Sequence, residues 1–430
     1  MEFKPGDIIR IRKNGVWWEG TVMPREDRDY ITLKLKTGYN VGIKLEGVER
    51  IEKIGEIKLE RQKPVSFELE LKKDMPLVCV LSTGGTIASS IDYRTGAIQA
   101  SYQAEDIIKA VPEISNFVNL ESRLVFQEMS ENLTPKHWQI LAREVFREIK
   151  EKNPEGIVVL HGTDTLTYSA CALSFMLRNL SIPVIFTFAQ KSSDRGASDA
   201  FMNLLCSCIA AGRSDIAEVC VCGHATIEDN YCFVNRGHKT RKLHTSQRNA
   251  FRSINDFPLA RVFPEGKIEI INRRYFRKDK NREVKLEDKL EEKVALLKFH
   301  PGMDPEILDW YIERGYKGLV IEGTGLGHVN VSNTKFSFLP KIKRARKEGM
   351  IIAMTSQCIY GRVNPWIYSN LRKLREAGVL YLEDMLAECA LVKLMWALGK
   401  SKEEEEIKKI MLSNLANELN PRISPKTFLF

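Results

Sequence analysis

The sequence has no long hydrophobic run, and its first four residues lack the apolar core of a signal peptide. Crossing a bilayer requires about 20 consecutive apolar residues, and the longest aliphatic stretches here are far shorter. These absences argue against a membrane-spanning protein. We therefore expect a cytoplasmic protein that has no membrane partner.

Cysteine provides neither a disulfide framework nor a metal site in this sequence. The chain has nine cysteines, an odd number, and most of them lie in aliphatic, strand-like segments. Cys206 and Cys208, like Cys220 and Cys222, have one residue between them instead of the two that a zinc knuckle requires. We expect buried, reduced thiols and no bound metal.

The signals of a nucleotide-binding site are also missing. The glycine turn at Gly84 and Gly85 lacks the Gly-Lys-Ser/Thr ending of a phosphate-binding loop. A second glycine-rich stretch, residues 323–327, has no acidic residue at the distance that a dinucleotide fingerprint requires. The sequence therefore predicts no ATP site in this chain.

Charge is present in modest excess but is unevenly distributed. The 430 residues carry a formal net charge of +9. Residues 273–282 contain six basic residues and one acidic residue, and a second basic cluster occupies 341–347 on a predicted helix. Each cluster is either a solvated face or a contact for nucleic-acid phosphates.

A chain of this length is expected to form two or three domains. Residues 1–60 alternate apolar and polar side chains between turn signals, which predicts a small antiparallel β-barrel. A charged linker, 61–75, follows. Strand, loop and helix patterns then predict two α/β domains with largely parallel sheets, at 76–290 and at 291–430 with a helical tail.

Two short threonine-rich strings are the most informative feature of the chain. Ser-Thr-Gly-Gly-Thr-Ile-Ala occupies positions 82–88, and His-Gly-Thr-Asp-Thr occupies positions 161–165. Each follows an aliphatic run, 76–81 or 156–160, that predicts a buried parallel strand. Because ligands bind beyond the carboxyl ends of such strands, the two loops can face one pocket. Threonine hydroxyls, an aspartate and backbone N–H groups are the parts of an amide-hydrolysing site.

Each string also has a simpler interpretation. A glycine turn reverses the chain without a catalytic role, although this does not explain the hydroxyl residues around Gly84 and Gly85. Thr163 to Thr165 precede a helical pattern, and capping that helix is the simplest role for them. A helix N-terminus also gathers N–H donors for an oxyanion, so capping and catalysis are compatible.

A basic segment, residues 236–245, follows a further predicted strand at 218–222. Most of its charges are expected to be solvated. A lysine packed against Thr163 and Asp164 would differ, because desolvation and neighbouring cations depress the pKa of its amine. A neutral amine takes a proton from a threonine hydroxyl, so we expect the catalytic base in this segment.

The two strings and this basic segment, in this order, resemble the L-asparaginase/glutaminase family of amidohydrolases over roughly residues 76–400. The resemblance implies that Thr86 in the glycine turn is the nucleophile and that Tyr93, in the loop after it, assists. It implies further that a proton-transfer chain consists of Thr163, Asp164 and Lys242, the lysine of a Thr-x-Lys-x-x-Thr sequence.

The resemblance is incomplete where the family holds its substrate. The family's Ser-Gln pair for the substrate α-carboxylate and amine is Phe126-Gln127 here, so only Gln127 transfers. An asparagine of the family's C-terminal domain is replaced by Leu326. The backbone N–H groups around Gly85 and Thr163 are expected to receive the oxyanion, while the substrate grip differs from that of free-standing asparaginases.

One subfamily, the D subunits of archaeal glutamyl-tRNA(Gln) amidotransferases, adds an N-terminal barrel and a C-terminal string that matches residues 355–364. This resemblance implies a glutaminase that hydrolyses glutamine or asparagine and supplies ammonia to a partner. It implies a homodimer joined by E subunits into a heterotetramer, in which the E subunit binds Glu-tRNA(Gln). No cofactor is expected in this chain, and ATP and Mg are expected in the partner.

Two alternatives remain. A free-standing asparaginase or glutaminase would share the same motifs, although it would not need the extra barrel. A non-catalytic scaffold that only positions tRNA would not need intact Thr86, Thr163, Asp164 and Lys242.

Overall fold

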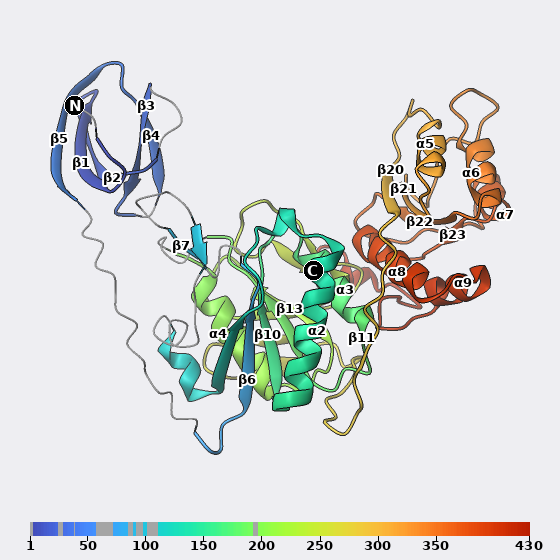
Figure 1. Cartoon of the computed structure of the whole chain (residues 1–430), viewed down its shortest axis with the longest axis horizontal. Helices are drawn as coiled ribbons and strands as arrows, with labels where there is room; N and C mark the ends of the chain where they lie inside the picture. The colour runs from blue at the N-terminus through green and yellow to red at the C-terminus, as the bar shows by residue number, and fades with distance from the viewer. Residues whose placement is uncertain are drawn as a thin grey trace.

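The computed structural model describes residues 3–24, 29–37, 39–56, 72–84, 89–91, 98–100, 111–191 and 197–430. Three of the predicted site residues, Gly85, Thr86 and Tyr93, lie outside the described residues. Figure 1 shows an N-terminal β-sheet, a central α/β region and a C-terminal α/β region in chain order.

The N-terminal sheet contains five strands in the order β4-β3-β2-β1-β5. All of its pairs are antiparallel, which confirms the antiparallel pairing predicted for this part of the chain. Its buried core consists of Ile9, Ile11, Val22, Ile31, Leu33 and Ile43. The strands are β1 (Asp7–Lys13), β2 (Val16–Val22), β3 (Tyr30–Leu35), β4 (Asn40–Lys44) and β5 (Val48–Glu56).

The central region is built on an eight-stranded sheet in the order β18-β17-β14-β13-β12-β10-β6-β9. The strands from β13 to β9 are parallel, whereas β14, β17 and β18 continue the sheet as antiparallel strands. The parallel part is β6 (Leu77–Ser82), β9 (Asn119–Leu124), β10 (Gly156–Leu160), β12 (Val184–Thr187) and β13 (Val219–His224). The antiparallel part is β14 (Cys232–Arg236), β17 (Ala260–Val262) and β18 (Ile268–Ile270).

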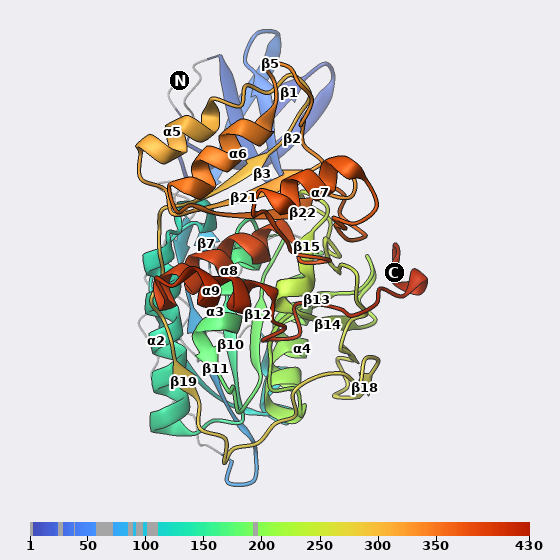
Figure 2. The ribbon, with the colours of Figure 1, turned by 90° about the vertical axis from the view of Figure 1, so that its right-hand side faces the viewer.

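Helices cover both faces of this sheet, so its central strands are apolar on both sides. Along β6, Cys79 and Leu81 belong to one hydrophobic core, and Val78 and Val80 belong to the other. The first core contains helices α2 (Pro135–Lys152) and α3 (Leu166–Met176), and the second contains α4 (Ala200–Arg213). Figure 2 shows α2 and α4 on opposite sides of the strands.

The C-terminal region has a parallel four-stranded sheet in the order β20-β21-β22-β23. Its last long helix, α8, packs against α3 and contributes side chains to the first core of the central region. Figure 1 shows α8 between α3 and the C-terminal sheet. The elements are β20 (Val294–Lys298), β21 (Gly318–Gly323), β22 (Ile351–Ser356), β23 (Leu380–Tyr381), α5 (Ile307–Glu313), α6 (Phe338–Lys347), α7 (Ser369–Glu376), α8 (Ala387–Lys400) and α9 (Glu404–Leu412).

Short elements complete the described structure. Two of them, β15 and β16, pair only with each other. The short strands are β7 (Ser89–Ile91), β8 (Ile98–Ala100), β11 (Leu177–Arg178), β15 (Thr240–Lys242), β16 (Phe251–Ser253) and β19 (Lys285–Leu286). The 3-10 helices are η2 (Pro112–Asn116), η3 (Ser130–Asn132), η4 (Gly237–Lys239) and η5 (Pro425–Thr427).

All nine cysteines carry free thiols, and only Cys358 is exposed, as predicted for reduced core thiols. In the described ranges, no three His, Cys, Asp or Glu side chains gather into a group that suits a metal ion. No helix of the described structure combines the length and apolarity needed to span a membrane.

Candidate active site

Three predicted site residues meet beside the carboxyl end of β10. The Lys242 Nζ donates to the Thr163 Oγ1 over 2.8 Å and to the Asp164 Oδ1 over 2.7 Å. The Thr163 hydroxyl in turn donates to the same Asp164 oxygen over 3.2 Å. The amine, the hydroxyl and the carboxylate therefore form a closed hydrogen-bonded triangle, although Lys242 is 78 residues away from Asp164 in the sequence.

The three groups differ in exposure and charge. The Lys242 side chain is 17% exposed, whereas the Asp164 side chain is 62% exposed. The hydrogen bond from Lys242 lowers the pKa of Asp164 below its usual range, although partial burial opposes this shift. Asp164 therefore stays ionised at neutral pH and holds the Lys242 amine next to the Thr163 hydroxyl.

The loop that carries Thr163 is anchored by His161, a residue that the sequence reasoning did not single out. His161 is fully buried, its Nδ1 donates to the Gly162 carbonyl over 2.7 Å, and its Nε2 lies 2.9 Å from the Ser169 hydroxyl. Because a carbonyl only accepts, Nδ1 carries the proton and Nε2 accepts from Ser169. Burial lowers the pKa of His161 to about 4 from its usual 6.5, so the imidazole is neutral.

This neutral, buried histidine makes stability depend on pH. Below pH 6.5 the unfolded chain binds a proton at His161 that the folded chain takes up only near pH 4, so stability is lost as the pH falls through this window. We expect His161 alone to lower the free energy of unfolding by up to about 3 kcal/mol over that window. Urea unfolding at pH 7 and pH 5 should show a steeper loss for the wild type than for His161→Gln. Equal losses would contradict the prediction.

Ser130 in η3 fixes the other side of the same loop. The Thr165 hydroxyl donates to the Ser130 carbonyl over 2.6 Å, and the Asp164 backbone N–H donates to the Ser130 hydroxyl over 3.3 Å. A Cβ on Gly162 would lie 2.7 Å from the Ser130 Cβ, so only glycine allows this close approach.

The interpretation of the threonines as side-chain caps of α3 is wrong. Thr165 occupies the N-cap position, but its side chain makes no capping hydrogen bond. Its hydroxyl is committed to Ser130, and the Thr163 hydroxyl is committed to Asp164. Among the described residues, none accepts a hydrogen bond from the Thr163 backbone N–H, which leaves this donor available for an oxyanion.

The start of the first string lies next to the second. The Thr83 hydroxyl donates to the Leu160 carbonyl over 2.8 Å, which ties the end of β6 to the end of β10. Gly84 has a φ of +99° and lies so close to Glu128 that a Cβ would be 2.6 Å from the Glu128 carbonyl oxygen. Gln127, the predicted substrate residue, is exposed on this neighbouring segment. The structure thus places Gln127 beside the turn that leads to Gly85.

The basic segment departs from its prediction. Arg236, His238 and Lys239 are buried, so the expectation that most of its charges are solvated is wrong for these residues. The Arg236 Nε bonds to Glu218 over 2.7 Å, and the Lys239 Nζ bonds to Asp384 over 2.7 Å. Acidic partners from distant parts of the chain make this burial possible, and nothing in the neighbouring residues indicates them.

The two basic clusters are partly neutralised by the chain itself. In the first, Arg277 pairs with Asp215 over 2.6 Å, and Lys280 pairs with Glu155 over 2.6 Å. In the second, which lies on α6 as predicted, Arg344 pairs with Asp309 over 2.8 Å. Surface pairs such as these contribute little stability, about 0–1 kcal/mol each, but they reduce the positive field.

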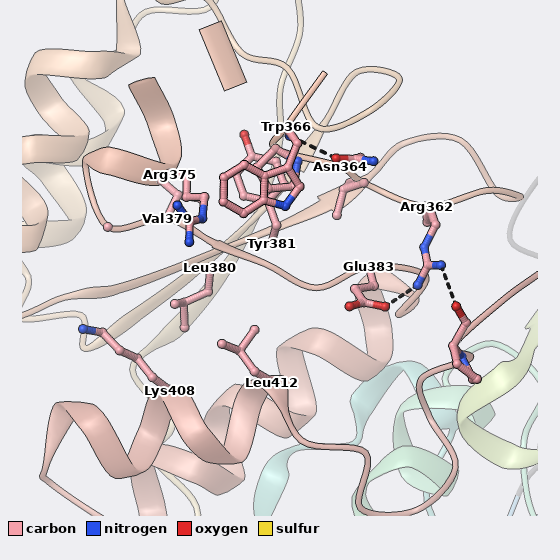
Figure 3. Close-up of a pocket in the computed structure, with 14 residues that line it drawn as sticks. Arg362, Asn364, Trp366, Arg375, Val379, Leu380, Tyr381, Glu383, Lys408 and Leu412 are labelled. Atoms are coloured by element: carbon pink, nitrogen blue, oxygen red, sulfur yellow. Dashed lines mark hydrogen bonds and ion pairs between the residues drawn. The ribbon is translucent and has the colours of Figure 1, made fainter. Parts of the chain in front are cut away.

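A large open cavity lies elsewhere, in the C-terminal region. It has a volume of about 720 Å³, and Figure 3 shows Trp366 and Arg375 on one side of it and Lys408 and Leu412 of α9 on the other. Arg375 stacks on the Trp366 ring at 4.1 Å. Of the predicted site residues that the structure describes, none lines this cavity.

Three protein-family models match consecutive parts of the chain. "Asparaginase, N-terminal" matches residues 77–275, and "Glutaminase/Asparaginase C-terminal domain" matches residues 293–411. The "GatD N-terminal domain" matches residues 3–54. These matches cover all three regions of the fold.

The similarity to curated relatives spans nearly the whole chain. The D subunit of the glutamyl-tRNA(Gln) amidotransferase of Pyrococcus furiosus is 49% identical over 99% of this chain and 97% of its own length. The chain belongs to the family of glutamyl-tRNA(Gln) amidotransferase D subunits. A more distant member, the D subunit from Sulfolobus acidocaldarius, is 43% identical over 96% of this chain and 91% of its own length.

Solved structures that resemble this member of the D-subunit family are asparaginases. The thermostable L-asparaginase from Thermococcus kodakarensis has a TM-score of 0.71 and 33% identity, and the match covers 80% of this chain and 100% of that one. L-asparaginase I from Vibrio cholerae has a TM-score of 0.68 and 27% identity, and the match covers 80% and 99%. The predicted asparaginase-like α/β fold is therefore confirmed.

Proposed function

We propose that this chain hydrolyses the side-chain amide of glutamine or asparagine through Thr86 and supplies the ammonia to a partner subunit that converts Glu-tRNA(Gln) to Gln-tRNA(Gln). The observation that carries the proposal is the triangle of Lys242, Thr163 and Asp164 beside the turn that leads to Thr86. The names of the full-length relatives support the tRNA-dependent role.

In the proposed reaction, the Thr86 oxygen attacks the amide carbon, and Tyr93 assists by polarising the Thr86 hydroxyl. The hydroxyl proton passes through Thr163 to the Lys242 amine, which must be neutral at that moment, and then to the leaving ammonia. Asp164 orients Lys242 and stabilises its protonated form. Water then releases the acid from the Thr86 ester by the same proton path.

Two further groups have supporting roles. Backbone N–H groups around Gly85 and Thr163 stabilise the negative oxygen of the tetrahedral intermediate. Gln127 holds the α-carboxylate and the amine of the substrate. Every step of the proposed reaction uses side chains and backbone groups of the chain, and no step uses a cofactor.

The proposed assembly is supported by the resemblance to the D-subunit family and not by the geometry of the chain. Two copies of this chain form a homodimer that binds E subunits, and the E subunit binds Glu-tRNA(Gln) and holds ATP and Mg. Free hydrolysis would waste amide donor, so the glutaminase is expected to be slow in the isolated chain.

The deciding experiment measures ammonia release from glutamine and from asparagine, by the chain alone and by the complex with the E subunit and Glu-tRNA(Gln). We expect a low rate for the chain alone and a clear increase in the full complex. Full activity of the isolated chain, with no stable partner in a pull-down, would instead indicate a free-standing asparaginase or glutaminase.

A further inference from the structure

The strand that carries Lys242 is not part of the large central sheet. Among the described strands, β15 pairs only with β16, in a two-stranded sheet of three residues each. So short a pair has little stability of its own. The position of Lys242 therefore depends on how neighbouring side chains hold residues 239–242.

The first of these anchors is a fully buried ion pair to the C-terminal region. Both Lys239 and Asp384 have side chains that are 0% exposed, and the Lys239 Nζ donates to the Asp384 Oδ2 over 2.7 Å and to the Asp384 carbonyl over 3.2 Å. Asn420 of the C-terminal tail donates to Asp384 from its backbone N over 3.0 Å and from its Nδ2 over 2.9 Å. Both carboxylate oxygens of Asp384 thus accept hydrogen bonds, as a buried carboxylate requires.

The second anchor is on β15 itself. The Arg241 Nε pairs with the Glu388 Oε1 over 2.9 Å, and Glu388 lies in the first turn of α8. Successive side chains of a strand point to opposite sides. Arg241 accordingly reaches α8, while Lys242 reaches Thr163 and Asp164. Figure 2 shows β15 beside α8.

We propose that Asp384 and Glu388 are positioning residues, which hold β15 from the C-terminal region so that the Lys242 amine reaches Thr163 and Asp164. The proposal deepens the proposed function and rests on it for its catalytic consequence. Under this proposal the C-terminal region supports the site in two places, because α8 also packs on α3, the helix that follows the Thr163 loop. The C-terminal region then supports both segments of the triangle: β15, which carries Lys242, and the loop that carries Thr163 and Asp164.

The test compares three single substitutions in the full chain within its complex. Asp384→Asn keeps the shape but removes the charge that pairs with Lys239, and Glu388→Gln does the same for the half-buried Arg241. Glu418→Gln is the matched control, because Lys393 and Glu418 are also a fully buried pair, with 0% exposure on both sides and a distance of 2.5 Å. The described hydrogen bonds of that pair do not include residues 239–242.

The first measurement does not depend on catalysis. Brief acetylation of the native protein with acetic anhydride, followed by mass spectrometry, gives the reactivity of the Lys242 amine. We expect this rate to rise about threefold or more in Asp384→Asn and Glu388→Gln, because loosening β15 weakens the hydrogen bonds that protect Lys242. Glu418→Gln should leave it unchanged.

The second measurement is the steady-state hydrolysis of glutamine. We expect kcat to fall about tenfold or more in the two positioning variants, since small displacements of catalytic groups are costly, with KM little changed. An unchanged Lys242 labelling rate in both variants, or an equal rise in Glu418→Gln, would overturn the inference. Raised labelling with normal kcat would uphold the positioning and overturn the proposed role of Lys242. If Asp384→Asn does not fold, Glu388→Gln alone decides.

Discussion

Replacing Lys242 with alanine is expected to lower the rate of ammonia release from glutamine by at least about a thousandfold, as the loss of a triad base does in other hydrolases. A threonine hydroxyl is a weak nucleophile unless a base takes its proton. The Lys242 amine lies within hydrogen-bond reach of the Thr163 hydroxyl, at 2.8 Å. The measurement is single-turnover and steady-state hydrolysis in the assembled complex.

The control for this substitution is Lys278→Ala. The Lys278 side chain is 16% exposed, close to the 17% of Lys242, and it is also ion-paired, with Glu155. Like Lys242→Ala, the Lys278→Ala substitution therefore removes a half-buried, ion-paired amine. Lys278 is far from the candidate site in the sequence. We expect its turnover to stay close to that of the wild type. Near-normal turnover of Lys242→Ala in the assembled complex would remove Lys242 from the mechanism.

Replacing Thr86 with alanine is expected to abolish glutamine-dependent amidation while leaving ammonia-dependent amidation intact. The variant loses the oxygen that is proposed to form the acyl intermediate, so the rate should fall by about a millionfold, as the loss of a serine nucleophile does elsewhere. The partner subunit's own reaction does not need Thr86, so added ammonium chloride should restore formation of Gln-tRNA(Gln). Both activities are measured on one preparation of the complex.

Thr226→Ala provides a control for this experiment. The Thr226 hydroxyl bonds within its own turn, to the Glu228 backbone. Its removal should change neither activity. Glutamine-dependent amidation that persists in Thr86→Ala would show that another group is the nucleophile. Loss of both activities would indicate that the variant disturbs the complex itself.

The sequence was most informative where the chemistry is local. Runs at 76–81, 156–160 and 218–222 predicted strands that the structure places within a residue or two. Pro135 begins α2 with Thr134 at its N-cap, and such a threonine-proline pair is a typical start of a helix. Such signals depend on the intrinsic preferences of a few adjacent residues, so they can be recognised without knowledge of the rest of the chain.

The basic segment, residues 236–245, differs most from what its local sequence indicates. Arg236 and Lys239 look like solvated cations in the sequence, but both side chains are almost completely buried. Their carboxylate partners, Glu218 and Asp384, lie 18 and 145 residues away. A charged side chain is buried only where an opposite charge and hydrogen-bond partners surround it. The order of the residues in the sequence does not show which distant residues become these partners.

The order of the amino acids was enough to specify the parts of the site: a glycine turn with Thr86, a Thr163-Asp164 pair after a buried strand, and a basic segment with Lys242. How these parts meet is a property of the folded chain, because Lys242 reaches Thr163 through the tertiary placement of β15 and not through any local preference. Hydrogen bonds and ion pairs act over about 3 Å. Only folding brings residues 79 positions apart within that range.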